Sequence, residues 1–242
     1  LADDQKMAYD GVGLLKYFLK TCDAVAFAHS RRIMHRDLKP ANVMVGSFGE
    51  VLVMDWGLAK EFEMKSASEG LERFVHESQF DLVDSEMNRE TAGLTMDGAI
   101  LGTPAYMSPE QARGDLEAMD ARTDIYALGA MLYEILTLKP PHQGKSASQV
   151  FSRIIRGEFL APSERAPEVN VPAELEAVVM KAMALHRGDR YQKVEELQEE
   201  IEAFRGGRTL RAVRYRLDQR IWKWVLRHRT LSASVAALVV VT

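Results

Sequence analysis

The stretch from Thr123 to Leu138, "TDIYALGAMLYEILTL", constrains the fold more than any other part of the sequence. Its apolar residues fall on nearly every side of a helix, and a helix that is apolar all round is buried among other elements. Pro140 and Pro141 follow shortly and cannot continue a helix, so the helix is expected to stop before them. The chain is therefore predicted to fold around a buried central helix.

Helices elsewhere in the chain can cover this segment. Residues 9–30 carry apolar side chains at roughly helical spacing, which predicts a long amphipathic helix. Three further helices are expected over residues 146–156, 172–185 and 191–204, the last ending at Gly206. Cys22 is the single cysteine, which excludes an internal disulfide framework. It is interpreted as a small buried hydrophobe.

A β-hairpin is predicted in "ANVMVGSFGEVLVMDWG", residues 41–57, where two short apolar runs flank Gly46 and Gly49. The fold class is therefore α+β and mainly α-helical. The 242 residues, 47% of them hydrophobic, suffice for a sizeable core. The formal charge of −4 does not favour nucleic acid as a partner.

The stretch "MHRDLKPANVMV", from Met34 to Val45, has the residues that phosphoryl transfer needs. Asp37 can orient an attacking hydroxyl and accept its proton. Lys39 can reach the transferring phosphate and offset its developing charge. Asn42 offers a carbonyl oxygen and Asp55 a carboxylate, which are the hard ligands that Mg²⁺ prefers.

Three motifs occur in a fixed order along the chain: "HRDLKPAN", "DWG" at Asp55–Gly57, and "GTPAYMSPE" at Gly102–Glu110. Together they resemble the catalytic loop, the DFG motif and the segment ending in APE of eukaryotic-type and bacterial serine/threonine protein kinases. The resemblance covers residues 1–206 and implies the large C-terminal lobe of the protein-kinase-like fold. Lys39 and Thr103 are similar to the serine/threonine branch rather than the tyrosine branch.

The resemblance implies the partners of the site. They are ATP, with Mg²⁺ or Mn²⁺ as the metal, and protein substrates whose serine or threonine hydroxyls accept the γ-phosphate. It also implies that Thr103 bridges Asp37 and Lys39, and that Met44 packs beneath the adenine ring.

The same resemblance implies structural roles for five residues. Asp124 on the central helix would hold the backbone of the catalytic loop, and Glu110 would pair with Arg190. His35 would pack against the aromatic residue of the metal-binding motif. That residue is Trp56 where the family has phenylalanine, so a bulkier ring is expected to fill the same apolar pocket.

The small N-terminal lobe of such kinases supplies a glycine-rich loop, a nucleotide-clamping lysine and a partner glutamate. We expect this lobe to be missing, because Gly11 and Gly13 lie in a helical pattern and do not make G-x-G-x-x-G. The chain alone is then expected to bind ATP poorly and to be inactive. An alternative is a pseudokinase, a non-catalytic binding module; the upstream sequence would distinguish the two.

The expected activation segment, about residues 55–110, includes a strongly acidic stretch. Residues 61–100 have ten acidic residues against three basic ones and are predicted to be a long, partly flexible loop. A solvated loop is one interpretation. The other is that Thr95, or Thr91 as second choice, is phosphorylated and pairs with Arg36 to order the loop.

The composition changes sharply after residue 206. Residues 205–229 hold eight arginines and one lysine with interleaved tryptophans, and an uncharged apolar run follows. This pattern is typical of a cytoplasmic helix end that meets a bilayer. We therefore expect a basic juxtamembrane segment over 207–229, the start of a truncated transmembrane helix over 230–242, and lipid contact through 207–242.

These expectations describe a single-pass membrane protein with a cytoplasmic kinase domain, and dimerisation for autophosphorylation is a further possibility. The alternatives for the tail are a short buried segment or a peripheral lipid-binding segment, because a span needs about 20 apolar residues. The lone histidines His29, His76, His142 and His186 have no metal-ligand spacing, so surface or capping roles are predicted for them.

Overall fold

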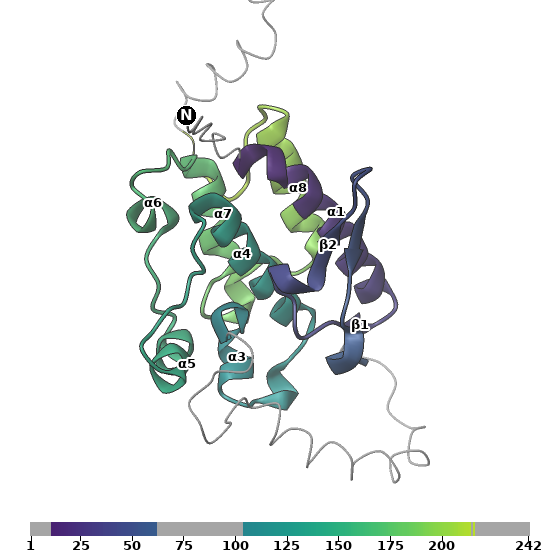
Figure 1. Cartoon of the computed structure of the whole chain (residues 1–242), viewed down its shortest axis with the longest axis vertical. Helices are drawn as coiled ribbons and strands as arrows, with labels where there is room; N and C mark the ends of the chain where they lie inside the picture. The colour runs from purple at the N-terminus through teal and green to yellow at the C-terminus, as the bar shows by residue number, and fades with distance from the viewer. Residues whose placement is uncertain (1–10, 62–103, 214, 216–242) are drawn as a thin grey trace, which may run out of the picture.

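The computed structural model describes residues 11–61, 104–213 and 215, and this part of the chain is mainly helical (Figure 1). Its α-helices are α1 Gly11–Ser30, α3 Pro109–Ala112, α4 Ala121–Thr137, α5 Ala147–Arg156, α6 Pro162–Arg165, α7 Ala173–Ala182 and α8 Val194–Arg205. Its strands are β1 Ile33–Met34, β2 Val43–Val45, β3 Val51–Val53 and β4 Lys60–Glu61. Its 3₁₀ turns are η1 Pro40–Asn42, η2 Trp56–Leu58, η3 Pro104–Tyr106, η4 Leu116–Ala118 and η5 Arg187–Asp189.

Helix α4 lies at the centre of the core, as its apolar composition predicts. Thirteen of its residues are buried, and α1, α6, α7 and η3 pack around it. The Asp120 side chain caps the helix start by accepting a hydrogen bond from the Arg122 N–H. The helix ends where Leu138 adopts a left-handed conformation, with φ 57°, two residues before Pro140. The predicted span, 123–138, is therefore confirmed to within two residues.

Helices α1, α7 and α8 complete the core, and Figure 1 shows α1 and α8 side by side. The predicted helices over 9–30, 146–156, 172–185 and 191–204 are confirmed as α1, α5, α7 and α8, with ends that shift by up to three residues. Cys22 is fully buried on α1, and this burial raises the pKa of its thiol. The four-residue helices α3 and α6 were not predicted, because one helical turn has no periodicity to detect.

The predicted hairpin is confirmed as β2 and β3, which pair antiparallel with Met44 opposite Leu52. Gly49 closes the turn with φ 82°, a conformation that favours glycine. Strand β3 packs on α1, and β1 pairs with β4. Within the described ranges, the strands form two two-stranded sheets and no larger one.

The chain remains docked on the helical lobe beyond α8. Leu210 is buried, and the buried Glu200 carboxylate accepts hydrogen bonds from the Arg211 and Ala212 N–H groups. The first residues of the segment predicted to be juxtamembrane thus pack on α8. None of the helices in the described ranges is long and apolar enough to span a membrane, and residues 230–242 lie outside these ranges.

A close approach of α4 to α7 at Gly129 leads to a prediction about packing. A Cβ atom on Gly129 would lie 2.7 Å from the Ala182 Cβ and 2.9 Å from the Met183 Cγ. We expect Gly129→Ala to lower the free energy of unfolding by about 1–2 kcal/mol, since overpacking exceeds the gain in helix propensity. Urea denaturation of the whole chain measures this change.

The matched control is Gly188→Ala, because a Cβ atom there meets open space. This control should change the free energy of unfolding by no more than about 0.5 kcal/mol. Equal stability of the two variants would contradict the close packing of α4 on α7.

Candidate active site

The backbone of the predicted catalytic loop is held by one carboxylate from the first turn of α4. Asp124 is 1% exposed. Its Oδ2 accepts a 2.8 Å hydrogen bond from the His35 N–H, and its Oδ1 accepts a 2.9 Å hydrogen bond from the Arg36 N–H. Arg36 has φ 69°, a left-handed conformation that is costly for a residue with a side chain. The two charge-assisted hydrogen bonds offset that cost and fix the direction of the loop.

His29 also contacts Asp124, with Nε2 2.8 Å from Oδ2, and its side chain is only 10% exposed. The prediction of a surface or capping role was therefore wrong for His29. The sequence did contain a signal for burial, because His29 follows Cys22 and Val25 at helical spacing on the buried stripe of α1.

His142 is a second histidine whose surface prediction was wrong. It is buried, and its Nε2 lies 2.7 Å from the Tyr126 hydroxyl. Burial lowers its pKa to about 4, so the ring is neutral near pH 7. It belongs to the core beside α4. His186, by contrast, lies at the N-cap position of η5, although its side chain makes no capping hydrogen bond.

Asp37 lies at the centre of the candidate site and is half-buried. Lys39 Nζ is 2.7 Å from Asp37 Oδ2, and Asn42 Nδ2 donates to the same oxygen at 3.1 Å and to the Asp37 carbonyl oxygen at 2.8 Å. Within the described part of the chain, both side-chain contacts fall on Oδ2. The carboxylate is therefore oriented while Oδ1 stays available as a proton acceptor.

The two predicted metal ligands are linked through the backbone. Asn42 uses Nδ2 for its bonds to Asp37, which leaves the amide oxygen Oδ1 as a potential ligand. The Met54 N–H donates to the Asn42 carbonyl oxygen at 2.8 Å, so the residue before Asp55 is tied to the catalytic loop. Asp55 is exposed and left-handed, with φ 61°.

An amide oxygen and a carboxylate suit Mg²⁺, which takes its remaining ligands from water and phosphates. The described residues contain no cluster of three or more His, Cys, Asp or Glu side chains that could hold a metal. Gly57, the last residue of the DWG motif, lies beside Asp55. A Cβ atom built on Gly57 would lie 3.4 Å from Asp55 Oδ1, which is an ordinary van der Waals contact.

His35 and Trp56 pack against each other beneath the site. His35 is fully buried, and its ring centroid is 4.5 Å from that of Trp56. Its Nδ1 accepts from the Asp37 N–H at 3.2 Å, so Nε2 carries the proton and donates to the Met54 carbonyl oxygen at 2.9 Å. The Trp56 indole donates to the Val53 carbonyl oxygen at 2.9 Å, a hydrogen bond that phenylalanine cannot make.

Glu110 and Arg190 form a buried ion pair below the site, with oxygen–nitrogen distances of 2.8 and 3.0 Å. The Thr123 hydroxyl donates to the same carboxylate at 2.9 Å. Burial alone would raise the pKa of Glu110, but the hydrogen bonds and charge of Arg190 outweigh burial and lower it.

Helix α3 is joined to the catalytic loop by a residue that sequence reasoning missed. Gln111 completes a capping box with Ser108 and donates from Nε2 to the Arg36 carbonyl oxygen at 2.6 Å. The sequence signal was the S-x-x-Q pattern of a capping box, which predicts a helix start but no long-range partner.

The remaining predicted residues stand apart from this network. Met44 is 51% exposed and Leu52 57% exposed, and the two share one face of the hairpin as register partners. Thr103, Thr95 and Thr91 lie outside the described residues.

Comparison with known proteins identifies the family. The model of the protein kinase domain family matches residues 3–201. The chain is 38% identical over 198 residues to serine/threonine-protein kinase PknD of Protochlamydia amoebophila. This match covers 82% of this chain and 19% of that protein. It is 37% identical over 213 residues to PknD of Chlamydia caviae, covering 87% and 21%, and 39% identical over 188 residues to PknD of Chlamydia felis, covering 78% and 18%.

The chain therefore belongs to the protein kinase domain family. It spans about a fifth of the length of the curated relatives it matches.

The buried ion pair generates a prediction about stability. We expect Arg190→Gln to lower the free energy of unfolding by about 3–5 kcal/mol at pH 7, because it leaves the Glu110 charge buried without its partner. The loss should shrink as the pH falls below the usual glutamate pKa. Protonation of Glu110 removes the buried charge from the variant, and it also removes the stabilising ion pair from the unsubstituted protein. Urea denaturation between pH 3 and 7 measures both effects.

The control for this variant is Arg156→Gln, because Arg156 pairs with Glu158 on the surface. Its effect should stay within about 1 kcal/mol at every pH. A loss for Arg190→Gln that does not depend on pH would contradict the role of the Glu110 charge.

The His29 contact generates a second prediction. We expect His29→Ala to speed hydrogen exchange of the His35 and Arg36 amides about tenfold, because Asp124 loses a partner that orients its carboxylate. The Phe27→Ala variant is the control, since that neighbouring side chain is exposed. Exchange measured by mass spectrometry or NMR should leave α4 unchanged in both variants. Unchanged exchange at the two loop amides in His29→Ala would refute the coupling.

Proposed function

We propose that the chain is the catalytic lobe of a serine/threonine protein kinase, which transfers the γ-phosphate of ATP to serine and threonine hydroxyls of proteins. The observation that carries the proposal is the orientation of the Asp37 carboxylate by Lys39 and Asn42. The loop backbone that bears these groups is itself fixed by Asp124.

The residues present divide the chemical work. Asp37 uses Oδ1 to orient the substrate hydroxyl and to accept its proton. Lys39 lies beside this carboxylate and is within reach of a phosphate brought to the hydroxyl, whose developing negative charge it stabilises. Thr103 is assigned the same bridging position between Asp37 and Lys39 as in the family.

Asn42 Oδ1 and the Asp55 carboxylate would hold Mg²⁺ or Mn²⁺. The metal, when bound, neutralises charge on the phosphate oxygens of the nucleotide. Trp56 and His35 support this side of the site by fixing the strand end that precedes Asp55.

The adenine ring is proposed to bind over Met44, with Leu52 beside it on the same face of the hairpin. The exposure of these two apolar side chains favours a surface that another part of the protein covers. We assign that cover, with the glycine-rich loop and the clamping lysine, to residues outside the described ranges. The described part of the chain is then expected to bind ATP weakly by itself.

The proposal extends to the cellular setting. The lobe is placed on the cytoplasmic side of a membrane, with lipid contacts through residues 207–242, on the strength of the basic segment and the apolar run. Thr95 or Thr91 is proposed as a phosphorylation site that pairs with Arg36 after autophosphorylation between two copies. The half-buried position of Arg36 beside Asp37 favours this role.

The test is phosphoryl transfer from radiolabelled ATP to a serine- and threonine-containing substrate, using the protein that carries this chain together with its nucleotide-binding lobe. We expect Asp37→Asn to lower kcat by about 10²–10⁴-fold, because the general base is lost. Asp23→Asn is the matched control, since Asp23 is exposed on α1 and hydrogen-bonds to Gln198 rather than to the candidate site.

Normal transfer by Asp37→Asn would refute the mechanism. A folded parent protein that transfers no phosphate would favour the pseudokinase alternative instead.

A further inference from the structure

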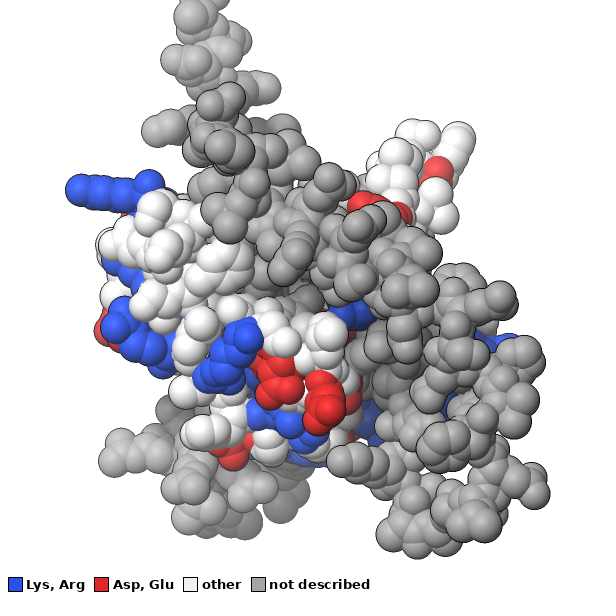
Figure 2. Space-filling model, turned by 90° about the horizontal axis from the view of Figure 1, so that it is seen from below, with Lys and Arg blue, Asp and Glu red and all other residues white. Residues whose placement is uncertain are grey.

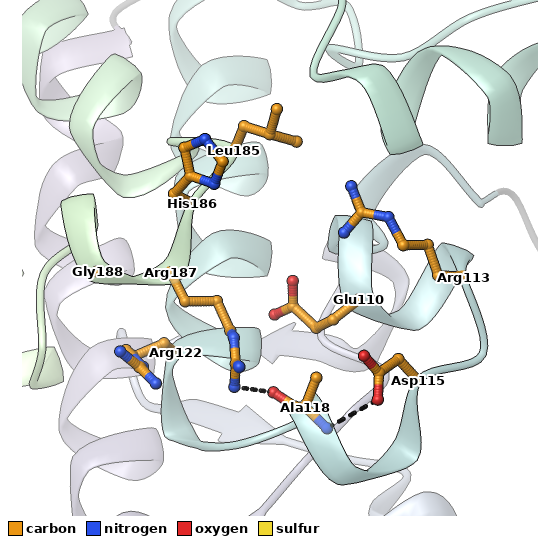
Figure 3. Close-up of a pocket in the computed structure, with 9 residues that line it drawn as sticks. All are labelled: Glu110, Arg113, Asp115, Ala118, Arg122, Leu185, His186, Arg187 and Gly188. Carbon is orange, nitrogen blue, oxygen red and sulfur yellow. Dashed lines mark hydrogen bonds between the residues drawn. The ribbon is translucent and has the colours of Figure 1, made fainter.

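A polar cavity of about 330 Å³ lies between α3, η4 and η5, and no residue of the catalytic loop lines it. Figure 3 shows that its walls come from segments far apart in the sequence, with Arg113 on one side and Arg187 on the other. In Figure 2, which views the molecule from below, Lys and Arg side chains lie beside Asp and Glu side chains on the described surface. The net charge of the cavity depends on which of its arginine and carboxylate side chains are already paired.

The carboxylates around the cavity are largely committed to other partners. Glu110 lines the cavity and is held by Arg190 and Thr123, which are not part of the lining. Asp115 Oδ1 accepts a hydrogen bond from the Ala118 N–H at 3.1 Å and so caps η4.

Asp120, just outside the lining, binds Arg122 through both carboxylate oxygens at 3.0 and 2.6 Å. Burial alone would raise the pKa of Asp120, but Arg122 and Arg187 outweigh it and hold the pKa below its usual value. Asp120 is therefore ionised near pH 7 and neutralises Arg122.

Two guanidinium groups keep donors for a ligand. Arg187 uses Nη1 to contact the Ala118 carbonyl oxygen and, at 3.0 Å, Asp120. Arg113 uses Nη2 to contact the Ile155 carbonyl oxygen at 2.8 Å. Each guanidinium has five N–H donors, so both retain donors on other nitrogens. The four arginines Arg113, Arg122, Arg187 and Arg190 outnumber the three carboxylates Glu110, Asp115 and Asp120 by one.

We propose that this cavity, which we call the arginine pocket, binds the phosphate monoester of a phosphorylated protein segment between Arg113 and Arg187. Guanidinium groups match phosphate oxygens in geometry and charge, and two groups on opposite walls can each donate to a different oxygen. The volume of the cavity exceeds that of a phosphate group, so the side chain that carries the phosphate also fits. His186 lies in the same lining and offers a further ring nitrogen.

A peptide-borne phosphate fits the lining better than a nucleotide does. None of the nine lining residues is Phe, Tyr or Trp, so a base has no such ring on which to stack. The pocket is open at the surface, and Arg113 in its lining is exposed, so a peptide chain can cross its rim. Binding at this pocket does not require phosphoryl transfer by the chain and is measured without it.

The test is fluorescence anisotropy of the full 242-residue chain with a labelled Ala-Gly-pThr-Gly-Ala peptide and its unphosphorylated counterpart. We expect binding of the phosphopeptide alone, and Arg113→Gln and Arg187→Gln should each weaken it about tenfold, as the loss of a charge-assisted hydrogen bond predicts. Arg156→Gln is the control, because it removes the same charge from an exposed pair elsewhere. This control should change the affinity less than about twofold.

Arg113 is exposed, so its variant tests the pocket even if Arg187→Gln loosens η4, and thermal unfolding verifies that each variant is folded. Equal binding of both peptides, or equal loss in all three variants, would overturn the proposal. So would unchanged affinity in folded Arg113→Gln. Competition by inorganic phosphate at the peptide's own concentration would overturn the assignment to a protein segment and identify a site for free phosphate.

Discussion

The Asp124 carboxylate is the contact on which the rest of the site depends. It is buried at the start of the central helix and accepts hydrogen bonds from two successive backbone N–H groups of the catalytic loop, while His29 approaches it from α1. A buried carboxylate is costly unless it is fully hydrogen-bonded, so its position and that of the loop are mutually fixed. The left-handed Arg36 and the orientation of Asp37 follow from that arrangement.

A second buried contact, the Glu110–Arg190 ion pair, plays the corresponding role for the segment around α3. It joins α3 to the turn before α8, and Gln111 of α3 reaches back to the Arg36 carbonyl oxygen. The segment that follows the undescribed residues 62–103 is thereby tied both to the catalytic loop and to the helical core. Glu110 of this ion pair also lines the arginine pocket, so one contact supports the site and neutralises a charge that would otherwise repel an anion.

Different parts of the structure were predictable to different degrees. The central helix, the four helices around it and the β2–β3 hairpin followed from periodicity and from turn residues, because burial of apolar faces dictates both. The candidate residues Asp37, Lys39, Asn42 and Asp55 were named from their spacing and chemistry, and their catalytic roles stay a proposal. The buried contacts of His29 and His142 were not predictable, because a lone histidine in a sequence gives no sign of the carboxylate or tyrosine that folding brings to it. The short helix α3 was missed because one helical turn has no periodicity, and the bond from Gln111 to the Arg36 carbonyl oxygen was missed because its partner is distant in sequence.

The sequence by itself determined which residues could carry phosphoryl transfer and which segments had to be buried, since both depend on residue type and local spacing. Only the tertiary structure decided how those residues are held. It set which oxygen of Asp37 is occupied, brought His29 to Asp124 across 95 positions of chain, and assembled the arginine pocket from α3, η4 and η5. These outcomes depend on contacts between segments that are distant in sequence, and no local pattern specifies which of many possible partners a buried polar group will meet.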